Sequence, residues 1–131
     1  AFSLVILTGI SHGAALDVVT EFTNVDSFKD EMVNERTFKA SVEKILRLSN
    51  IEYRIVRTSK APLWLQFKLQ YVYVEPKQAR FVSLVSGVRD SELREICGTQ
   101  AVAWRVAPGG HDIINSSIEN YLRAFLLQCF K

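Results

Sequence analysis

Cys97 and Cys129 carry the most reactive side chains of the sequence, and the chain has no other cysteine. In an oxidising compartment such a pair forms a disulfide, whereas in a reducing compartment the thiols stay separate. Together with His12 and His111 they do not form a recognised zinc-binding set, because their spacings match none of the known ligand patterns. The sequence therefore predicts no metal site.

His111 follows Gly109-Gly110, directly before an expected helix. A catalytic pair of Cys97 and His111 would need both side chains within hydrogen-bond reach, but we expect them at opposite ends of the last strand. The glycine pair could hold an anion on backbone amides, yet it lacks the lysine of a P-loop and the dinucleotide-binding fingerprint. No Gly-x-Ser-x-Gly elbow occurs, and no carboxylates are paired for acid–base chemistry. The sequence thus predicts no catalytic residue and no cofactor.

The length of 131 residues suits a single domain with one true core. The chain is 48% hydrophobic and 23% charged, which is typical of a globular protein and argues against disorder. Its 16 Lys and Arg residues against 14 Asp and Glu residues give a net charge of +2. Without a basic cluster, this balance argues against a nucleic-acid partner.

Residues 1–15 differ from the rest, because AFSLVILTGISHGAA contains no Lys, Arg, Asp or Glu. The apolar run Ala1–Ile10 is too short to span a bilayer but resembles the end of a secretory signal peptide, with cleavage before Leu16. This interpretation requires a positively charged segment ahead of the run. The alternative is a buried strand over Phe2–Leu7 followed by a glycine loop. We predict a signal peptide at 1–15, one domain at 16–131, no stable membrane span, and a periplasmic or extracellular location.

Two segments have the periodicity of amphipathic helices. The first begins after Asn34, a favourable N-cap, and ends near Asn50, which can adopt a left-handed conformation. The second begins near Asp112 and continues towards the C-terminus. Each helix carries its apolar side chains on one stripe. The stripes are Phe38, Val42, Ile45 and Leu46 in the first helix, and Ile114, Ile118, Tyr121, Leu122, Phe125, Leu126 and Cys129 in the second.

Five segments are predicted to be strands because they alternate in polarity or are rich in β-branched residues. Leu63–Glu75 has the clearest alternation, and Pro76-Lys77-Gln78 then makes a tight connection consistent with a hairpin. Asp90–Gly98 is expected as a polar loop with a short helical turn at Ser91–Glu95. The predicted strands are Leu16–Thr23, Ile51–Arg57, Leu63–Glu75, Ala79–Val88 and Thr99–Ala107.

The resulting order, β-α-β-β-β-β-α, predicts an α+β domain. Each amphipathic helix needs an apolar surface to cover, and the alternating strands supply one such face. We therefore expect both helices on one face of a mostly antiparallel five-stranded sheet. The crossover through the first helix would place the first two strands parallel, with or without a strand between them, and the last four strands should form an antiparallel meander.

This fold would bring Cys97 and Cys129 together. The last strand runs roughly 26 Å at about 3.3 Å per residue, and the second helix returns roughly 27 Å at about 1.5 Å per residue. With a tight Pro-Gly-Gly reversal between them, the helix ends beside the start of the strand. We predict a Cys97–Cys129 disulfide in an exported protein. The alternative is two free thiols in a reducing cytosol, with Cys129 buried as a small hydrophobic residue.

The sheet face away from the helices is the candidate interaction surface. It combines aromatic and aliphatic side chains with Arg, Lys and Gln, a composition that suits protein binding. An open sheet face is also normal, and the N-terminal segment or a second copy of the domain could cover it. The candidate residues are Trp64, Gln66, Lys68, Gln70, Val72, Arg54 and Arg105.

The segments FKASVEKILRLSNIEYRIV, LWLQFKLQYVYV, AVAWRV and IENYLRAFLLQCF follow one another in a characteristic order. In this order the sequence resembles small bacterial exported domains of uncharacterised function, which share a signal peptide, a strand, a helix, antiparallel strands and a C-terminal helix. The resemblance covers Leu16–Lys131 as a pattern of elements, and it implies no catalytic residue.

We expect a non-enzymatic exported module that binds an unknown protein partner or forms a homo-oligomer through the free sheet face or an edge strand. One alternative is a binding protein for a small apolar ligand, with a cavity between the sheet and the side chains of Phe38, Phe67, Tyr71 and Phe125. Another alternative is an enzyme of unrecognised type. Aromatic residues on a sheet also occur in RNA-binding modules, but the order of elements and the low net charge argue against that function.

Overall fold

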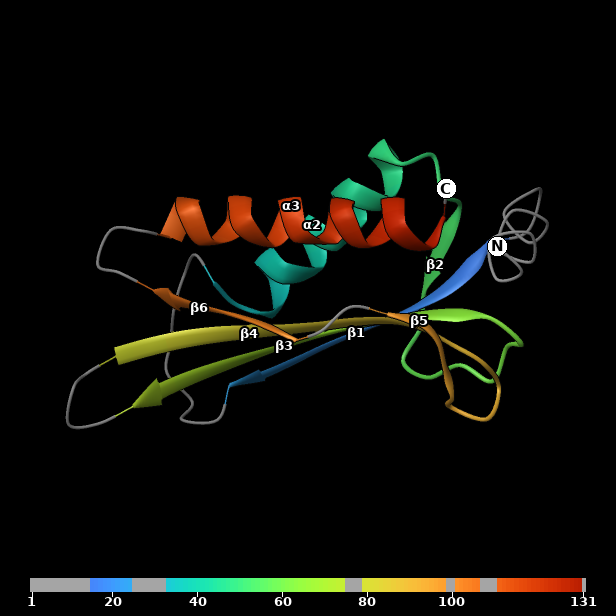
Figure 1. The fold of residues 1–131 in the computed structure, drawn as a ribbon, viewed down its shortest axis with the longest axis horizontal. Helices are drawn as coiled ribbons and strands as arrows, with labels where there is room; N and C mark the ends of the chain where they lie inside the picture. Colours follow the sequence, from blue (N-terminus) through green and yellow to red (C-terminus); the bar gives the residue numbers. More distant parts are fainter. Residues whose placement is uncertain (1–14, 25–32, 75–78, 99–100, 107–110, 131) are drawn as a thin grey trace.

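The computed structural model describes residues 15–24, 33–74, 79–98, 101–106 and 111–130 (Figure 1). The described chain has two layers, a six-stranded sheet and a pair of helices. Both helices lie on the same side of the sheet (Figure 1), which confirms the predicted α+β fold class. The predicted signal peptide (apart from Ala15) and the connection Pro76–Gln78 lie outside the described residues.

The first half of the domain is a β-α-β unit formed by β1 (Leu16–Asn24), α2 (Glu35–Leu48) and β2 (Tyr53–Ile55). Asn34 caps α2, because its side chain accepts a hydrogen bond from the Thr37 N–H at 3.0 Å while its own N–H donates to Thr37 Oγ1 at 2.9 Å. The turn after the helix contains Asn50 with φ 57°, the left-handed conformation that was expected there. β1 and β2 are parallel, as predicted, and they pair directly with no strand between them.

The longest ladder joins β3 (Trp64–Val74) to β4 (Ala79–Arg89) in an antiparallel hairpin, which agrees with the prediction. On its other edge β3 pairs with β1 in parallel. The expected antiparallel meander is therefore confirmed for its last three strands, but its first strand is misplaced, because β1 lies between β2 and β3 in the order β2-β1-β3-β4-β5. The short β2 covers only Leu16–Val18 of β1, so β1 obtains most of its backbone hydrogen bonds from β3.

The predicted last strand, Thr99–Ala107, is confirmed as β6 (Val102–Val106). β5 (Glu95–Gly98) is an additional strand, so the sheet has six strands instead of the expected five, and both β5 and β6 are antiparallel to β4. The helical turn expected at Ser91–Glu95, within the predicted loop, is wrong. The Asp90 N–H donates to the Arg94 carbonyl at 3.0 Å and closes a hairpin between β4 and β5. The chain is extended at β5 because its backbone forms ladder hydrogen bonds to β4, which an isolated helical turn would not provide.

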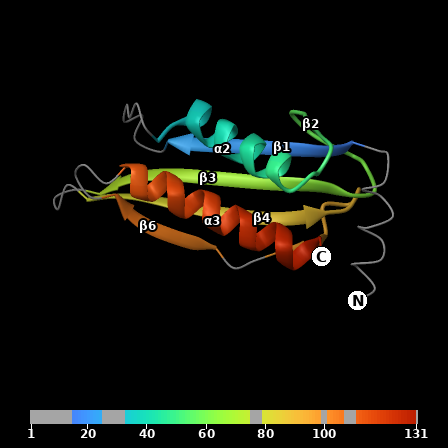
Figure 2. The same cartoon turned by 90° about the horizontal axis from the view of Figure 1, so that it is seen from above.

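α2 and α3 (His111–Cys129) lie side by side over the sheet (Figure 2). The Phe125 ring of α3 meets Phe67 of β3 edge-on at a centroid distance of 5.6 Å. Lys44 of α2 bonds Glu119 of α3 at 2.9 Å. Apart from the half-buried Tyr121, the predicted stripe residues are all buried: Phe38, Val42, Ile45, Leu46, Ile114, Ile118, Leu122, Phe125, Leu126 and Cys129.

The structure joins Cys97 of β5 to Cys129 of α3 in a disulfide, with their Cα atoms 6.0 Å apart. Cys97 lies opposite Val88 of β4 and therefore on the side of the sheet that the helices cover. This is the pair that strand and helix lengths predicted. The bond fixes the end of α3 to an edge of the sheet.

Candidate functional site

The sheet face opposite the helices carries no further helix or strand within the described ranges (Figure 1). We call this side the open face. Its side chains belong to residues that lie opposite one another across neighbouring strands and therefore point to the same side. The open face consists of Glu21, Thr23, Gln66, Lys68, Gln70, Val72, Phe81, Ser83, Val85, Ala103 and Arg105.

Most residues of the predicted interaction surface lie on the open face or at its margin. Those from β3 alternate along the strand as the sequence indicated: Gln66, Lys68, Gln70 and Val72. Arg105 of β6 joins them because it lies opposite Phe81 of β4. Arg54 of β2 lies opposite Asp17 at the far edge of the sheet, so the structure does not bring it next to Arg105.

Trp64 shares this side of the sheet but is only 4% exposed, so its predicted exposure is wrong. Its indole Nε1–H donates a hydrogen bond to the Asp90 carbonyl at 2.9 Å. Trp64 is the first residue of β3 and lies next to the turn that follows β4. Alternation in the sequence gives the side to which a residue points, but it does not show a turn that covers the residue.

One end of the open face carries an apolar pair. Val72 lies opposite Phe81, whereas Val85 lies opposite Lys68 in the middle of the hairpin, beyond the pair of Gln70 and Ser83. Phe81 is 37% exposed, and Arg105 flanks it from β6. Exposed aromatic rings beside arginine are enriched in protein interfaces. Phe81 was not among the predicted interface residues, because Phe81-Val82-Ser83-Leu84-Val85 is apolar on both sides apart from Ser83 and does not show which side the helices cover.

The other end of the sheet has a charged corner formed by Asp17, Arg54 and Ser59. Arg54 Nη2 lies 2.6 Å from Asp17 Oδ1, and Ser59 Oγ donates to Oδ2 at 2.7 Å. The hydrogen bond from Ser59 is the main cause that lowers the pKa of Asp17; burial opposes the shift and Arg54 reinforces it. The Arg54 side chain stays 67% exposed. The corner therefore combines a fixed carboxylate with a cation that still faces solvent.

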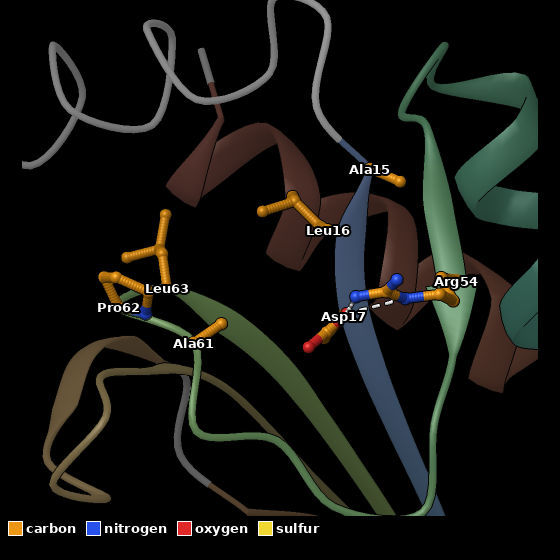
Figure 3. A pocket seen from close by; sticks show the side chains of 7 residues that line it. All are labelled: Ala15, Leu16, Asp17, Arg54, Ala61, Pro62 and Leu63. Carbon is orange, nitrogen blue, oxygen red and sulfur yellow. Dashed lines mark hydrogen bonds and ion pairs between the residues drawn. The ribbon is translucent and has the colours of Figure 1, made fainter.

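A small pocket lies beside this corner (Figure 3). Its apolar wall is formed by Leu16, Ala61, Pro62 and Leu63, and Asp17 and Arg54 line its polar side. The volume is about 240 Å³, below the range of about 300–1,000 Å³ in which drug-sized ligands bind. Its size suits a single side chain or a very small molecule.

The turn between β4 and β5 is organised by Asp90. The Asp90 carboxylate accepts hydrogen bonds from the N–H of Glu92 at 2.8 Å and from the N–H of Arg94 at 2.9 Å. The backbone hydrogen bond from Arg94 is the main cause that lowers the pKa of Asp90. Arg89 Nη1 donates to the Leu93 carbonyl at 3.1 Å. The turn is thus held by its own residues and by the strand before it.

Leu93 has φ 65°, the left-handed region that favours glycine. Such a conformation costs a residue other than glycine on the order of 1–3 kcal/mol. The Leu93 side chain is 65% exposed, and Ile96 nearby is 37% exposed, so burial of Leu93 within this chain does not explain its presence. The sequence analysis missed the turn because the alternation Glu95-Ile96-Cys97, the available strand signal, is short.

The aromatic residues expected around an apolar cavity are packed in the core instead. Phe38, Phe67, Tyr71 and Phe125 belong to one buried cluster, and none is more than 2% exposed. The part of the chain that the structure describes contains no group of three or more His, Cys, Asp and Glu side chains placed to hold a metal ion. In the same ranges, no helix has the length and apolarity that crossing a membrane requires.

No protein-family model matches this chain, and no curated protein matches its sequence. Solved structures share its fold. A single-substitution variant of PelC from Paraburkholderia phytofirmans, solved as a dodecamer, matches with a TM-score of 0.56 at 16% identity, over 88% of this chain and 89% of that chain. A second PelC dodecamer from that organism gives a TM-score of 0.51 at 13% identity, with the same coverage of 88% and 89%.

A hypothetical protein of Chlamydia trachomatis, CT253, matches with a TM-score of 0.48 at 8% identity, over 86% of this chain and 98% of that chain. The two PelC structures come from a bacterium and are covered to 89% by this chain, in agreement with the predicted resemblance to small bacterial domains. At these identities the likeness establishes the fold alone.

Proposed function

We propose that this chain is a non-enzymatic exported module that assembles with copies of itself through the open face. The observation that carries the proposal is the apolar end of that face, where the partly exposed Phe81 lies beside Val72 and Arg105. Removing such a surface from water is favourable. A second copy that covers the open face would do so, with Lys68 of the interior strand β3 inside the contact and Arg105 of β6 at its margin.

The fold likeness supports self-assembly over an unrelated protein partner, because both PelC structures are dodecamers. Self-assembly also needs no charge complement from a different protein, since the open face carries Glu21 beside Lys68 and can pair opposite charges with its own copy.

Full-length protein measured by native mass spectrometry over a range of concentrations tests this proposal. Phe81→Glu would place a carboxylate opposite Arg105, a substitution that the isolated fold tolerates. We expect oligomers of the unsubstituted chain and monomers of Phe81→Glu. Leu48→Glu is the matched control, because Leu48 is 61% exposed on the helical side, and it should assemble normally. An unsubstituted chain that stays monomeric, or a Phe81→Glu variant that assembles normally, would contradict the proposal.

Export is the second part of the proposal. The Cys97–Cys129 disulfide supports it, because disulfides persist in oxidising compartments outside the cytosol. Residues 1–15 are proposed as the signal peptide and 16–131 as the mature domain. Mass spectrometry of protein from its native host should show cleavage before Leu16 and no free thiol. Uncleaved protein with two free thiols would contradict export.

A further inference from the structure

Leu93 projects from a turn whose shape is fixed in advance. Asp90 accepts two backbone hydrogen bonds within the turn, and the Trp64 indole holds the Asp90 carbonyl from the sheet. A glycine would suit the φ of 65° better, so the leucine side chain serves something other than the geometry of the turn. Because the backbone of the turn is already held in place, little backbone entropy is lost when a partner binds the exposed leucine.

The same chain offers a pocket of matching chemistry. The wall formed by Leu16, Ala61, Pro62 and Leu63 is apolar and suits one aliphatic side chain. Arg54 at its rim pairs with Asp17 but stays 67% exposed, and Glu92, the residue before Leu93, pairs with Arg94 at 3.1 Å and stays 70% exposed. When a leucine enters such a pocket, the acidic residue beside it can meet the basic residue at the rim.

The turn between β4 and β5 lies at the same end of the sheet as the start of β1 (Figure 1), where Leu16 and Asp17 line the pocket. One row of opposed residues connects them across the strands: Arg54, Asp17, Trp64, Arg89 and Glu95. β1 and β4 are separated by two strand spacings, about 10 Å. A projection and a recess this close together on one molecule form a self-complementary patch, which a two-fold axis can pair with its copy.

We infer that Leu93 of one copy docks into the Leu16–Pro62–Leu63 pocket of a second copy, and that the two copies exchange this contact reciprocally. Glu92 of each copy then lies beside Arg54 of the other. The inference rests on the proposed self-assembly and names the surfaces of one of its contacts, at the margin of the open face.

Leu93→Gly separates this role from a purely structural one. Glycine adopts a positive φ without strain, so the melting temperature of the variant should equal or exceed that of the unsubstituted chain. Its dissociation constant for self-association, measured by sedimentation over a concentration series, should rise at least tenfold. Leu127→Ala removes an equally exposed leucine, 61% exposed on α3, and should leave the dissociation constant unchanged.

Ala61→Trp tests the pocket from the other side, because the indole would fill it. This variant alone should also associate at least tenfold more weakly. A mixture of Leu93→Gly and Ala61→Trp should associate more tightly than either variant alone, because each mixed pair keeps one intact contact. The turn of the Ala61→Trp chain still meets the open pocket of the Leu93→Gly chain.

Normal self-association of Leu93→Gly, or a mixture no tighter than its components, would overturn this inference. In that case the proposed function stands as long as Phe81→Glu still abolishes assembly. An unsubstituted chain that is monomeric at every concentration would overturn both.

Discussion

The two faces of the sheet are built from the same strands but have opposite characters. On β3, Leu65, Phe67, Leu69 and Tyr71 point towards the helices and are at most 1% exposed. The residues between them point to the open face, where polar and apolar side chains mix and the Lys68 side chain is exposed. The helices thus cover one face within a single chain, whereas no described helix or strand covers the open face.

The largest loss of stability is expected from a substitution in the core of the covered face. Phe125→Ala, in contact with Phe67 on the covered face, should lower the free energy of unfolding by about 3–5 kcal/mol through cavity formation. Phe81→Ala on the open face should cost less than about 1 kcal/mol, measured on monomers. Urea unfolding of both variants checks this difference, and equal losses would mean that the two faces are equally packed.

Loss of the disulfide comes next. Replacing Cys97 and Cys129 together by Ala opens a loop with a sequence separation of 32. The chain-entropy model predicts a loss of about 3–4 kcal/mol for such a loop. The covered face should remain folded, because its core of Leu and Phe side chains is unchanged. Denaturant unfolding and circular dichroism measure both quantities, and a stability equal to that of the oxidised chain would contradict the prediction.

Replacing Ser86 should raise the free energy of unfolding instead of lowering it. Its hydroxyl is fully buried on the covered face and, among the described atoms, has no hydrogen-bond partner. Ser86→Ala removes the cost of that buried polar group and should stabilise the domain by about 1 kcal/mol. The matched control is Ser83→Ala. Ser83 is half-buried on the open face, where water can bond its hydroxyl, so the change in the free energy of unfolding should be near zero. A clear destabilisation by Ser86→Ala would contradict the assignment.

The smallest effect concerns the charged corner and depends on pH. The folded pKa of Asp17 lies below its ordinary value of 3.8, chiefly through Ser59. The carboxylate therefore contributes stability above that value, and the contribution is lost as pH falls through the lowered pKa. Asp17→Asn should be less stable than the unsubstituted chain near pH 7, and the difference should shrink in acid. Thermal unfolding over a pH series would contradict this if the difference stayed constant.

The sequence predicted the covered face well because its signals are local and redundant. The stripes of both helices and the alternation of Leu63–Glu75 all require an apolar partner on one side, and they led to the right layers and to the Cys97–Cys129 pair. The order of the strands was only partly predictable, since nothing in Ile51–Arg57 shows that β2 would be three residues long and leave β1 to pair with β3.

The open face was predicted less completely because its character depends on contacts between distant segments. Alternation placed Gln66, Lys68, Gln70 and Val72 correctly, but the burial of Trp64 depends on a turn that comes 26 residues later in the chain. Leu93 could not be recognised either, because its exposure and its positive φ arise only when Asp90 closes the hairpin.

The most direct test of the account measures whether a second copy covers the open face. Lysine acetylation of the assembled protein, with the Phe81→Glu monomer as reference, compares Lys68 on the open face with Lys39, which is exposed on α2. We predict that assembly protects Lys68 several-fold and leaves the labelling rate of Lys39 unchanged. Equal labelling of Lys68 in the assembly and the monomer would contradict the claim that this face is the interface.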